Sequence, residues 1–110
     1  MFKLAPAPTF DLTVELSGPG DAQAGKLQLV AKYLGRSALQ AWIKAAKDHE
    51  HDADWLLQVL ADWREVTDAQ GQPLAFGRDN LDRLLDAYPR SSQEVFDAYV
   101  AALVGARRKN

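Results

Sequence analysis

The two histidines of the chain, His49 and His51, lie in an acidic stretch, DHEHDAD, at residues 48–54. Imidazole and carboxylate groups are suitable ligands for a divalent metal ion. Residues two positions apart, however, point in different directions on a helix and share a face only in an extended segment. We therefore interpret the stretch as a solvated connection between two helices and predict no metal site.

Catalytic groups of other kinds are missing from the sequence or lack a suitable arrangement. The chain has no cysteine, which excludes thiolate catalysis, disulfides and Cys-ligated metal sites. It has no nucleophile-elbow sequence, and the glycines of SGPGDAQAG, residues 17–25, do not follow the order of a phosphate-binding loop. The acidic residues fit solvated helix faces and helix N-termini. We predict no catalytic residue, no cofactor and no enzymatic activity.

Net charge gives little indication of a partner. The formal charge is -2 and the pI is about 5.6, which does not favour nucleic acid or an anionic membrane. One basic cluster, ARRKN, stands at the end of the sequence. Its Arg107, Arg108 and Lys109 would complement the negative end of a helix or contact phosphates. We favour the first interpretation and keep a small nucleic-acid-binding regulator as an alternative.

Signals for export or membrane insertion are not found in the sequence. The N-terminal segment MFKLAPAPTF has no apolar run typical of a signal peptide, and no later stretch approaches the about 18 apolar residues of a membrane span. We expect a soluble protein that is not exported and has no membrane partner.

Two segments near the N-terminus alternate apolar and polar residues, which is typical of half-buried strands. The apolar positions are Phe10, Leu12, Val14 and Leu16 in the first segment and Leu27, Leu29, Ala31 and Tyr33 in the second. The turn-rich residues 17–26 between them predict an antiparallel hairpin with a long loop. Because a lone hairpin is marginal in water, its apolar face requires a further layer of structure.

Beyond Gly35 the apolar period changes from 2 to 3.6, which predicts amphipathic helices. We expect four helices, over residues 37–48, 52–63, 79–88 and 91–106. The three Trp residues fall at helical spacing and are expected in the core or at its edge rather than in a recognition patch.

Helix ends carry several recognisable signals. Ser37 and Asp52 are suitable caps for the first two helices, and Ser91 with Glu94 would form a capping box for the last. Pro89 ends the third helix because the residue before a proline disfavours helical backbone.

These elements together predict an α+β fold, with an N-terminal antiparallel β-hairpin followed by about four helices. We expect a single domain over residues 1–110. It would contain a β-hairpin region at 9–34, a helical region at 37–106 and a basic tail at 107–110.

The C-terminal half contains an ordered set of residues that a general fold pattern does not require. A Trp precedes a Gly-x-Pro-Leu-x-Phe segment, a Leu-Leu pair and a Tyr-Pro step, and an alanine-rich helix with a basic, Asn-ending tail follows. The members are Trp63, Val66, Asp68, Gly71, Pro73, Leu74, Phe76, Asn80, Leu81, Leu84, Leu85, Tyr88, Pro89, Tyr99, Arg107, Lys109 and Asn110. This motif resembles that of the phage tail assembly chaperones, small proteins of long-tailed phages and prophages. One departure is Gly77, where a Ser or Thr is expected, although Gly is an acceptable cap.

The linker part of this motif is interpreted as mainly structural, with direct contact to a partner as the alternative. Trp63 would close the second helix, and DAQG would turn the chain with Gly71 at positive φ. Pro73 would keep the residue before it extended, and Leu74 and Phe76 would alternate onto the core.

The resemblance implies a non-enzymatic role in tail assembly. Proteins of this family bind the long, helical tape measure protein in the host bacterial cytoplasm, keep it soluble and help the tail tube protein to assemble around it. They then leave, so they are not in the mature virion. Many are also made as a longer form by a programmed frameshift, which for this chain implies a frameshift-extended form of itself continuing past the basic tail.

A partner of this kind requires an apolar groove that accepts an amphipathic helix. We expect the last helix to contribute through its wide apolar face, Val95, Phe96, Tyr99 and Val100. The main alternative is a structural virion component, such as a minor tail or head-tail completion protein. A homo-oligomer also stays open.

Overall fold

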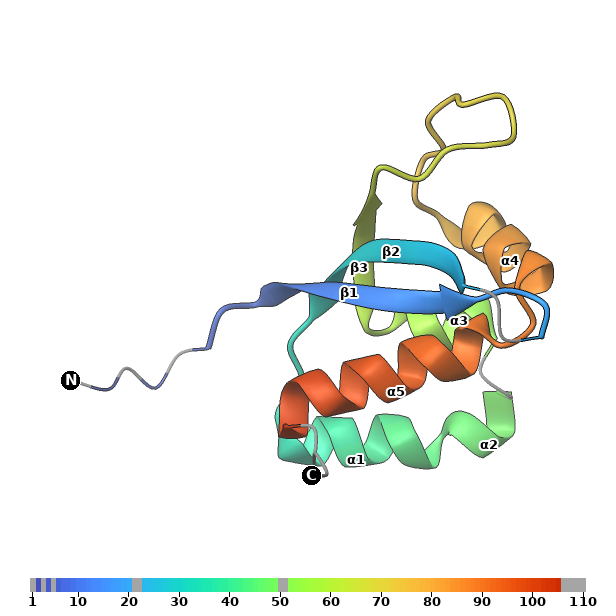
Figure 1. The fold of residues 1–110 in the computed structure, drawn as a ribbon. Helices are drawn as coiled ribbons and strands as arrows, with labels where there is room; N and C mark the ends of the chain where they lie inside the picture. Colours follow the sequence, from blue (N-terminus) through green and yellow to red (C-terminus); the bar gives the residue numbers. More distant parts are fainter. Residues whose placement is uncertain (1, 3, 5, 21–22, 50–51, 106–110) are drawn as a thin grey trace.

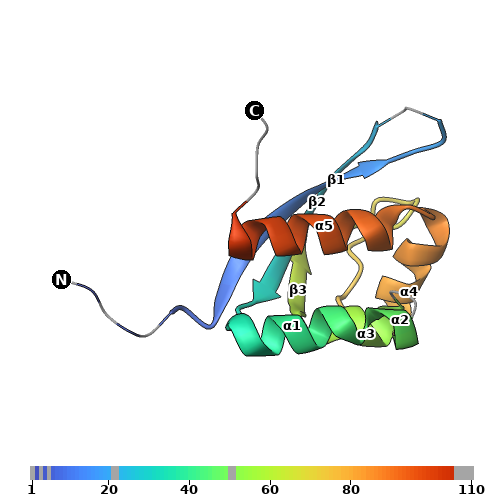
Figure 2. The same cartoon turned by 90° about the horizontal axis from the view of Figure 1, so that it is seen from below.

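A computed structural model describes residues 2, 4, 6–20, 23–49 and 52–105 (Figures 1 and 2). The strands are β1 (Thr9–Ser17), β2 (Gln23–Lys32) and β3 (Leu60–Arg64). The helices are α1 (Arg36–Lys44), α2 (Ala46–His49), α3 (Ala53–Leu57), α4 (Arg78–Ala87) and α5 (Ser91–Val104). The predicted α+β fold with an N-terminal antiparallel hairpin is confirmed, and a third strand is added to it.

The sheet has the order β1-β2-β3, and both strand pairs are antiparallel. The register places Leu12 opposite Leu29 and Val14 opposite Leu27, and all four side chains are buried. The residues between them in β1 are polar and exposed. The predicted period-2 pattern is therefore confirmed, since one face of the hairpin packs on the core and the other meets solvent. Tyr33, expected on the buried side, follows the end of β2 and is exposed.

The prediction of a single helix over residues 52–63 is wrong, because the second half of this segment forms the strand β3. The chain is helical only in α3, and Leu60–Arg64 pairs with β2. A register shift between Val30 and Ala31 sets Ala31 opposite Leu60 and Val30 opposite Asp62. This bulge lets Leu60 and Trp63 both face the core at a spacing of three, which imitates a helical period.

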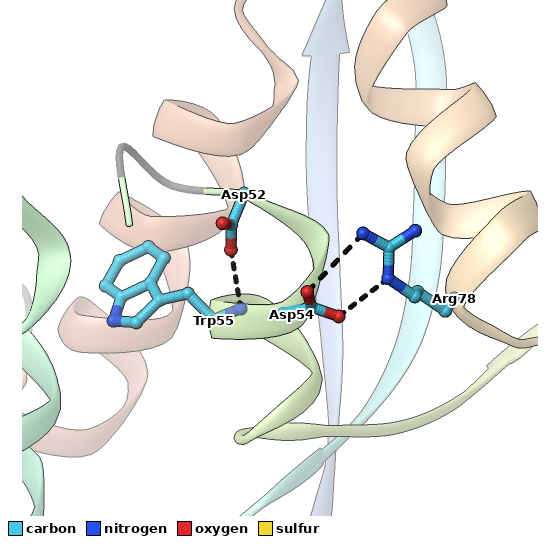
Figure 3. A network of polar contacts seen from close by, with 4 residues as sticks. All are labelled: Asp52, Asp54, Trp55 and Arg78. Carbon is cyan, nitrogen blue, oxygen red and sulfur yellow. Dashed lines mark hydrogen bonds and ion pairs between the residues drawn. The ribbon is translucent and has the colours of Figure 1, made fainter. Parts of the chain in front are cut away.

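The first predicted helix is divided, and its expected cap is wrong. α1 ends at Lys44, and α2 follows after Ala45. α1 begins one residue before Ser37, and its N-cap is Gly35, with no side-chain cap hydrogen bond. By contrast, the Asp52 cap is confirmed, because its carboxylate accepts a hydrogen bond of 2.8 Å from the Trp55 amide (Figure 3).

The expected capping box of Ser91 and Glu94 is also wrong, because Glu94 bonds to the hairpin instead. Its carboxylate accepts hydrogen bonds from the amide and the hydroxyl of Ser17, at 3.1 and 2.5 Å. The N-cap of α5 is Arg90, without a side-chain cap, and the buried Ser91 hydroxyl has no hydrogen-bond partner among the described residues. A contact distant in the sequence thus replaces the local one.

Two tryptophans form the centre of the core. The indole N–H of Trp42 donates to the Trp55 carbonyl at 3.0 Å, and the indole N–H of Trp55 donates to the Trp42 carbonyl at 2.9 Å. Their rings stack with centroids 4.1 Å apart at 4°. Phe96 of α5 stacks on both rings at 5.6 Å, and the edge of Tyr99 meets Trp42 at 5.1 Å. α1, α3 and α5 therefore share one aromatic cluster. Figure 1 shows α1 and α5 below the sheet.

Removing either partner of the tryptophan pair should have a measurable spectroscopic effect. We predict that Trp42→Phe and Trp55→Phe each lower the free energy of unfolding by roughly 2 kcal/mol, since both an indole hydrogen bond and ring contacts are lost. Each should also abolish an exciton couplet between the indoles in the circular dichroism spectrum. Trp63→Phe is the control and should keep the couplet; a couplet that survives in Trp42→Phe would contradict the stacked arrangement.

The hydrogen bond from Ser17 to Glu94 makes opposite predictions for two serines. Ser91→Ala should leave the free energy of unfolding within about 0.5 kcal/mol of the original or raise it, because no cap is lost. Ser17→Ala should lower it by about 1 kcal/mol, because a hydrogen bond to a carboxylate is removed. Urea unfolding measures the free energy of unfolding of both variants. A loss near 1 kcal/mol for Ser91→Ala would show that the Ser91 side chain caps α5 after all.

Candidate binding surface

The acidic and histidine-rich stretch shows no metal chemistry in the part that the structure describes. Among those residues no group of three or more His, Asp or Glu side chains is placed to hold an ion. Asp54 instead forms an ion pair with Arg78, in which Arg78 Nε lies 2.7 Å from Asp54 Oδ1 (Figure 3). This ion pair joins α3 to α4. The hydrogen bond and charge of Asp54 raise the pKa of Arg78 above its usual value. His51 and the His49 side chain lie outside the description, as does the basic tail.

The linker between β3 and α4 folds as a small hairpin that projects from the body (Figure 1). The Leu74 amide donates to the Val66 carbonyl at 2.8 Å, and Thr67 bridges to Pro73. At the tip, the Asp68 carboxylate accepts hydrogen bonds of 2.9 Å from the amides of Gln70 and Gln72. The predicted turn at DAQG is therefore confirmed, and Asp68 fixes it through backbone hydrogen bonds.

Glycine is required at one position of this turn. Gly71 has φ +82°, in the left-handed region that side chains disfavour. Its amide donates to the Asp68 carbonyl at 3.0 Å. The positive φ expected for Gly71 is confirmed.

Aromatic residues hold the base of the linker to the core. The indole of Trp63 donates to the Leu74 carbonyl at 2.8 Å and meets the edge of Phe76 with ring centroids 5.3 Å apart. Leu74 and Phe76 are half-buried against the core, as expected. Trp63 makes these contacts from β3 and does not close a helix as had been expected.

The remaining motif residues position α4 and α5. The Asn80 amide donates to the Ala75 carbonyl at 2.8 Å and so connects the linker to the first turn of α4. Leu81 is buried, while Leu84, Leu85 and Tyr88 are half-buried. α4 ends at Ala87, and Tyr88, directly before Pro89, has extended backbone as predicted.

Among the motif residues that the structure describes, Tyr99 is the most enclosed. Its side chain is fully buried, and its hydroxyl donates to the Lys32 carbonyl at 2.7 Å. It also stacks at 6.0 Å on Phe10 of β1. Burial raises the pKa of Tyr99 to about 12. Tyr99 thereby joins α5 to the hairpin, which is a structural role.

Many of the motif residues line a concave surface on α4. One cavity of about 220 Å³ lies between the linker and α4, and includes Trp63, Leu74 and Tyr88 in its lining. A second, of about 280 Å³, lies between α4 and the start of β2. Both are lined by Val66, Thr67, Leu84 and Tyr88, so they adjoin. We call this surface the Tyr88 groove.

A third cavity extends the Tyr88 groove toward the hairpin tip. It measures about 310 Å³ and is lined by Tyr88 and Pro89 on one side and Gly18 and Pro19 on the other. Arg90 closes it by donating to the carbonyls of Gly18, at 2.8 Å, and Gly20. The groove therefore has a mixed lining: Leu84 and Tyr88 are apolar, while Lys26, Glu65, Asp68 and Arg83 add charged groups.

The apolar face of α5 that was expected to meet a partner is turned inward. Val95 and Tyr99 are buried, and Phe96 and Val100 pack against the core. The reason is that this face contacts β1 and the tryptophan pair. In the sequence, the feature that coincides with the Tyr88 groove is the C-terminal motif, because several of its residues line that surface.

The fold and the groove define a small α+β protein that presents a concave surface between its linker, its hairpin and α4. A protein-family model described as phage tail assembly chaperone matches residues 1–110, the whole chain. The chain therefore belongs to the phage tail assembly chaperone family and has a role in tail assembly. This confirms the resemblance and extends it from the C-terminal half to the hairpin. Searches of curated proteins and of solved structures returned no match.

Within the described residues, no helix is both long enough and apolar enough to cross a bilayer.

The buried hydroxyl of Tyr99 predicts a pH dependence of stability. Its pKa is raised to about 12 in the folded protein, against about 10 when unfolded. The stabilisation is fully present below pH 10 and is lost as the pH rises through 12, because the unfolded state releases the proton first. We predict that Tyr99→Phe lowers the free energy of unfolding by about 1 kcal/mol at neutral pH. The free energy of unfolding of this variant should also decline less steeply at alkaline pH.

The matched control is Tyr33→Phe, because Tyr33 is 44% exposed. Denaturant unfolding from pH 8 to 12 compares the three proteins. If the free energy of unfolding of Tyr99→Phe fell with pH as steeply as that of the original chain, burial of the Tyr99 hydroxyl would not be the cause of the alkaline decline.

Proposed function

We propose that this protein binds the tape measure protein of its phage, keeps it soluble and promotes assembly of the tail tube around it. The observation that carries the proposal is the match of the whole chain to the phage tail assembly chaperone family. The action is non-enzymatic, takes place in the host bacterial cytoplasm and ends before the virion matures. The tail tube protein is the second partner, and a frameshift-extended form of the chain is a third.

The Tyr88 groove is the surface we assign to the tape measure protein. A long helical protein exposes apolar stripes with charged flanks until it is covered. The groove offers a complementary arrangement, with Val66, Leu84 and Tyr88 as apolar lining. Lys26 and Arg83 can attract acidic flanks of such a helix, and Glu65 and Asp68 can attract basic ones.

The groove is also suited to a contact that must be released. Its two adjoining cavities of about 220 and 280 Å³ fit a few side chains rather than a large interface. Interfaces with few strong anchors dissociate readily, and tail tube subunits must displace the chaperone. The motif residues would then act mainly by holding the linker and α4 in the geometry of the groove.

Co-expression with the tape measure protein of the same genome tests the proposal. We predict that the tape measure protein is soluble with the chaperone and insoluble without it. Ala87→Arg places a bulky cation where an exposed alanine lines two of the cavities, and should weaken binding at least about tenfold. Sedimentation of the co-expressed lysate and a pull-down of the tape measure protein measure the two effects.

Ala102→Arg is the matched control, because Ala102 is an exposed helical alanine of α5 outside the lining of the Tyr88 groove. It should bind as the original chain does. Equal insolubility of the tape measure protein with and without this chain would refute the chaperone role. Recovery of the chain from purified virions would favour a structural component instead.

A further inference from the structure

The sheet ends in two edge strands, β3 and β1, which differ in length and regularity. β3 has five residues, its register with β2 shifts at a bulge, and the Trp63 amide donates to the Asp62 carboxylate at 2.8 Å. Short edge strands and bulges protect a sheet edge from further pairing. β1 has nine residues, its register with β2 runs unbroken from Thr9 to Leu16, and no described strand lies beyond it (Figure 1). β1 is therefore the edge better suited to accept another strand.

The hydrogen bonds of the hairpin show which backbone groups of β1 face outward. The Tyr33 amide donates to the Pro8 carbonyl at 2.9 Å, so the backbone of Pro8 faces β2. Along a strand of an antiparallel pair, inward and outward backbone groups alternate. The amides and carbonyls of Thr9, Asp11 and Thr13 therefore point away from β2, toward the outer edge.

The hydrogen bond between Ser17 and Glu94 agrees with this alternation. Ser17 belongs to the outward series, and its amide donates to the Glu94 carboxylate of α5 at 3.1 Å. Near the hairpin tip the edge is thus closed by α5. The outward groups of Thr9, Asp11 and Thr13 lie before that point.

Side chains on the solvent face of β1 determine the kind of strand that fits this edge. Asp11, Thr13 and Glu15 are exposed there. Each carboxylate has a basic residue on its inner side: Arg64 of β3 lies 3.2 Å from Asp11, and Lys26 of β2 is opposite Glu15. Opposite charges in facing positions of neighbouring strands are favourable. A strand with a basic residue opposite each carboxylate would therefore continue the alternation of charge across the sheet.

A second copy of β1 is an unsuitable occupant of this edge. Two β1 strands paired antiparallel about Thr13 would place Asp11 of each copy opposite Glu15 of the other. Moving the register by two residues in either direction still leaves carboxylates on diagonal neighbours. Like charges in these positions are destabilising, and charged residues on an edge strand are a common protection against self-pairing. The same two carboxylates that disfavour a second copy favour a basic strand.

We propose that the outer edge of β1 binds an extended segment of a partner protein by β-strand addition. The backbone of Asp11 and Thr13 supplies the hydrogen bonds, and two basic side chains four residues apart in the partner lie opposite Asp11 and Glu15. The inference is independent of the proposed function, because Asp11, Thr13 and Glu15 are not among the residues that line the Tyr88 groove.

A synthetic peptide tests the hydrogen bonds. The probe is the end-blocked, symmetric peptide Val-Lys-Val-Thr-Val-Lys-Val, whose lysines match the spacing of Asp11 and Glu15. Its lysine and threonine amides would face β1, so its valine amides are N-methylated to prevent the peptide from pairing with itself. We expect hydrogen exchange of the Asp11 and Thr13 amides to slow at least about tenfold at saturating peptide. The Leu12 and Val14 amides face β2 and should exchange slowly with or without peptide.

The matched control is the same peptide methylated at its lysine and threonine amides instead, which removes the donors that face β1. It should bind at least about tenfold more weakly in an NMR titration. Unchanged exchange of Asp11 and Thr13 at millimolar probe would overturn the proposal, as would equal binding of the two peptides. A dimer of the chain that protects the same two amides without peptide would assign the edge to a second copy and would also refute it.

Thr13→Pro tests the edge from the side of the protein. It removes an amide that faces outward and leaves the ladder with β2 intact, and proline is accepted on edge strands. We expect the variant to bind the probe at least about tenfold more weakly. Urea unfolding shows whether it is folded, and undiminished binding would place the peptide elsewhere.

A charge exchange gives a test that does not depend on proline. Asp11→Lys combined with Glu15→Lys should weaken binding of the lysine probe at least about tenfold and should bind a peptide with glutamate in place of both lysines. Asp82→Lys combined with Asp86→Lys, two exposed positions of α4, changes the net charge equally and should bind the lysine probe as the original chain does. Equal losses in the two double variants would show that net charge, and not the β1 edge, attracts the peptide.

Discussion

The reciprocal pair of indole-to-carbonyl hydrogen bonds between Trp42 and Trp55 is the constraint on which the rest of this structure depends. α3 has only five residues, too few to be stable as an isolated helix. Its position against α1 is fixed because each tryptophan satisfies a carbonyl of the other helix while the two rings stack. Phe96 packs on this pair, which orients α5 so that Tyr99 reaches the Lys32 carbonyl. The sheet and the helices are thus joined through one aromatic cluster.

Elements determined by local pattern could be predicted from the sequence, and elements determined by distant contacts could not. The hairpin follows from alternation, and the Asp52 cap and the Pro89 stop follow from their neighbours in the chain. β3 was missed because a bulge gives Leu60 and Trp63 the spacing of a helix. The capping box was wrong because Glu94 bonds to Ser17, which lies 77 positions away. A local sequence motif cannot show whether the folded chain brings a distant residue close enough to compete for the same side chain, as Ser17 does for Glu94.

The same distinction applies to the candidate site. The motif from Trp63 to Tyr99 could be recognised as unusual from the sequence alone, and it identified the family. Its arrangement around Tyr88 could not be recognised, because it depends on the linker folding back through Asp68 and on the hairpin tip meeting Arg90. The apolar face of α5 was the more prominent pattern, yet the core uses it. An apolar stripe in a sequence therefore does not tell whether its partner belongs to the same chain.

The start of the linker shows how the core and the Tyr88 groove are connected. Glu65, in the lining of that groove, has φ +58°, a left-handed conformation that costs a side-chain-bearing residue roughly 1–2 kcal/mol. The cause lies on either side of it: Trp63 is paired with β2 and bonded to Leu74, while Val66 must enter the linker hairpin. The chain has to leave the sheet between these two fixed points. Because the tryptophan core stabilises one side and Asp68 the other, the strained residue is retained where the groove begins.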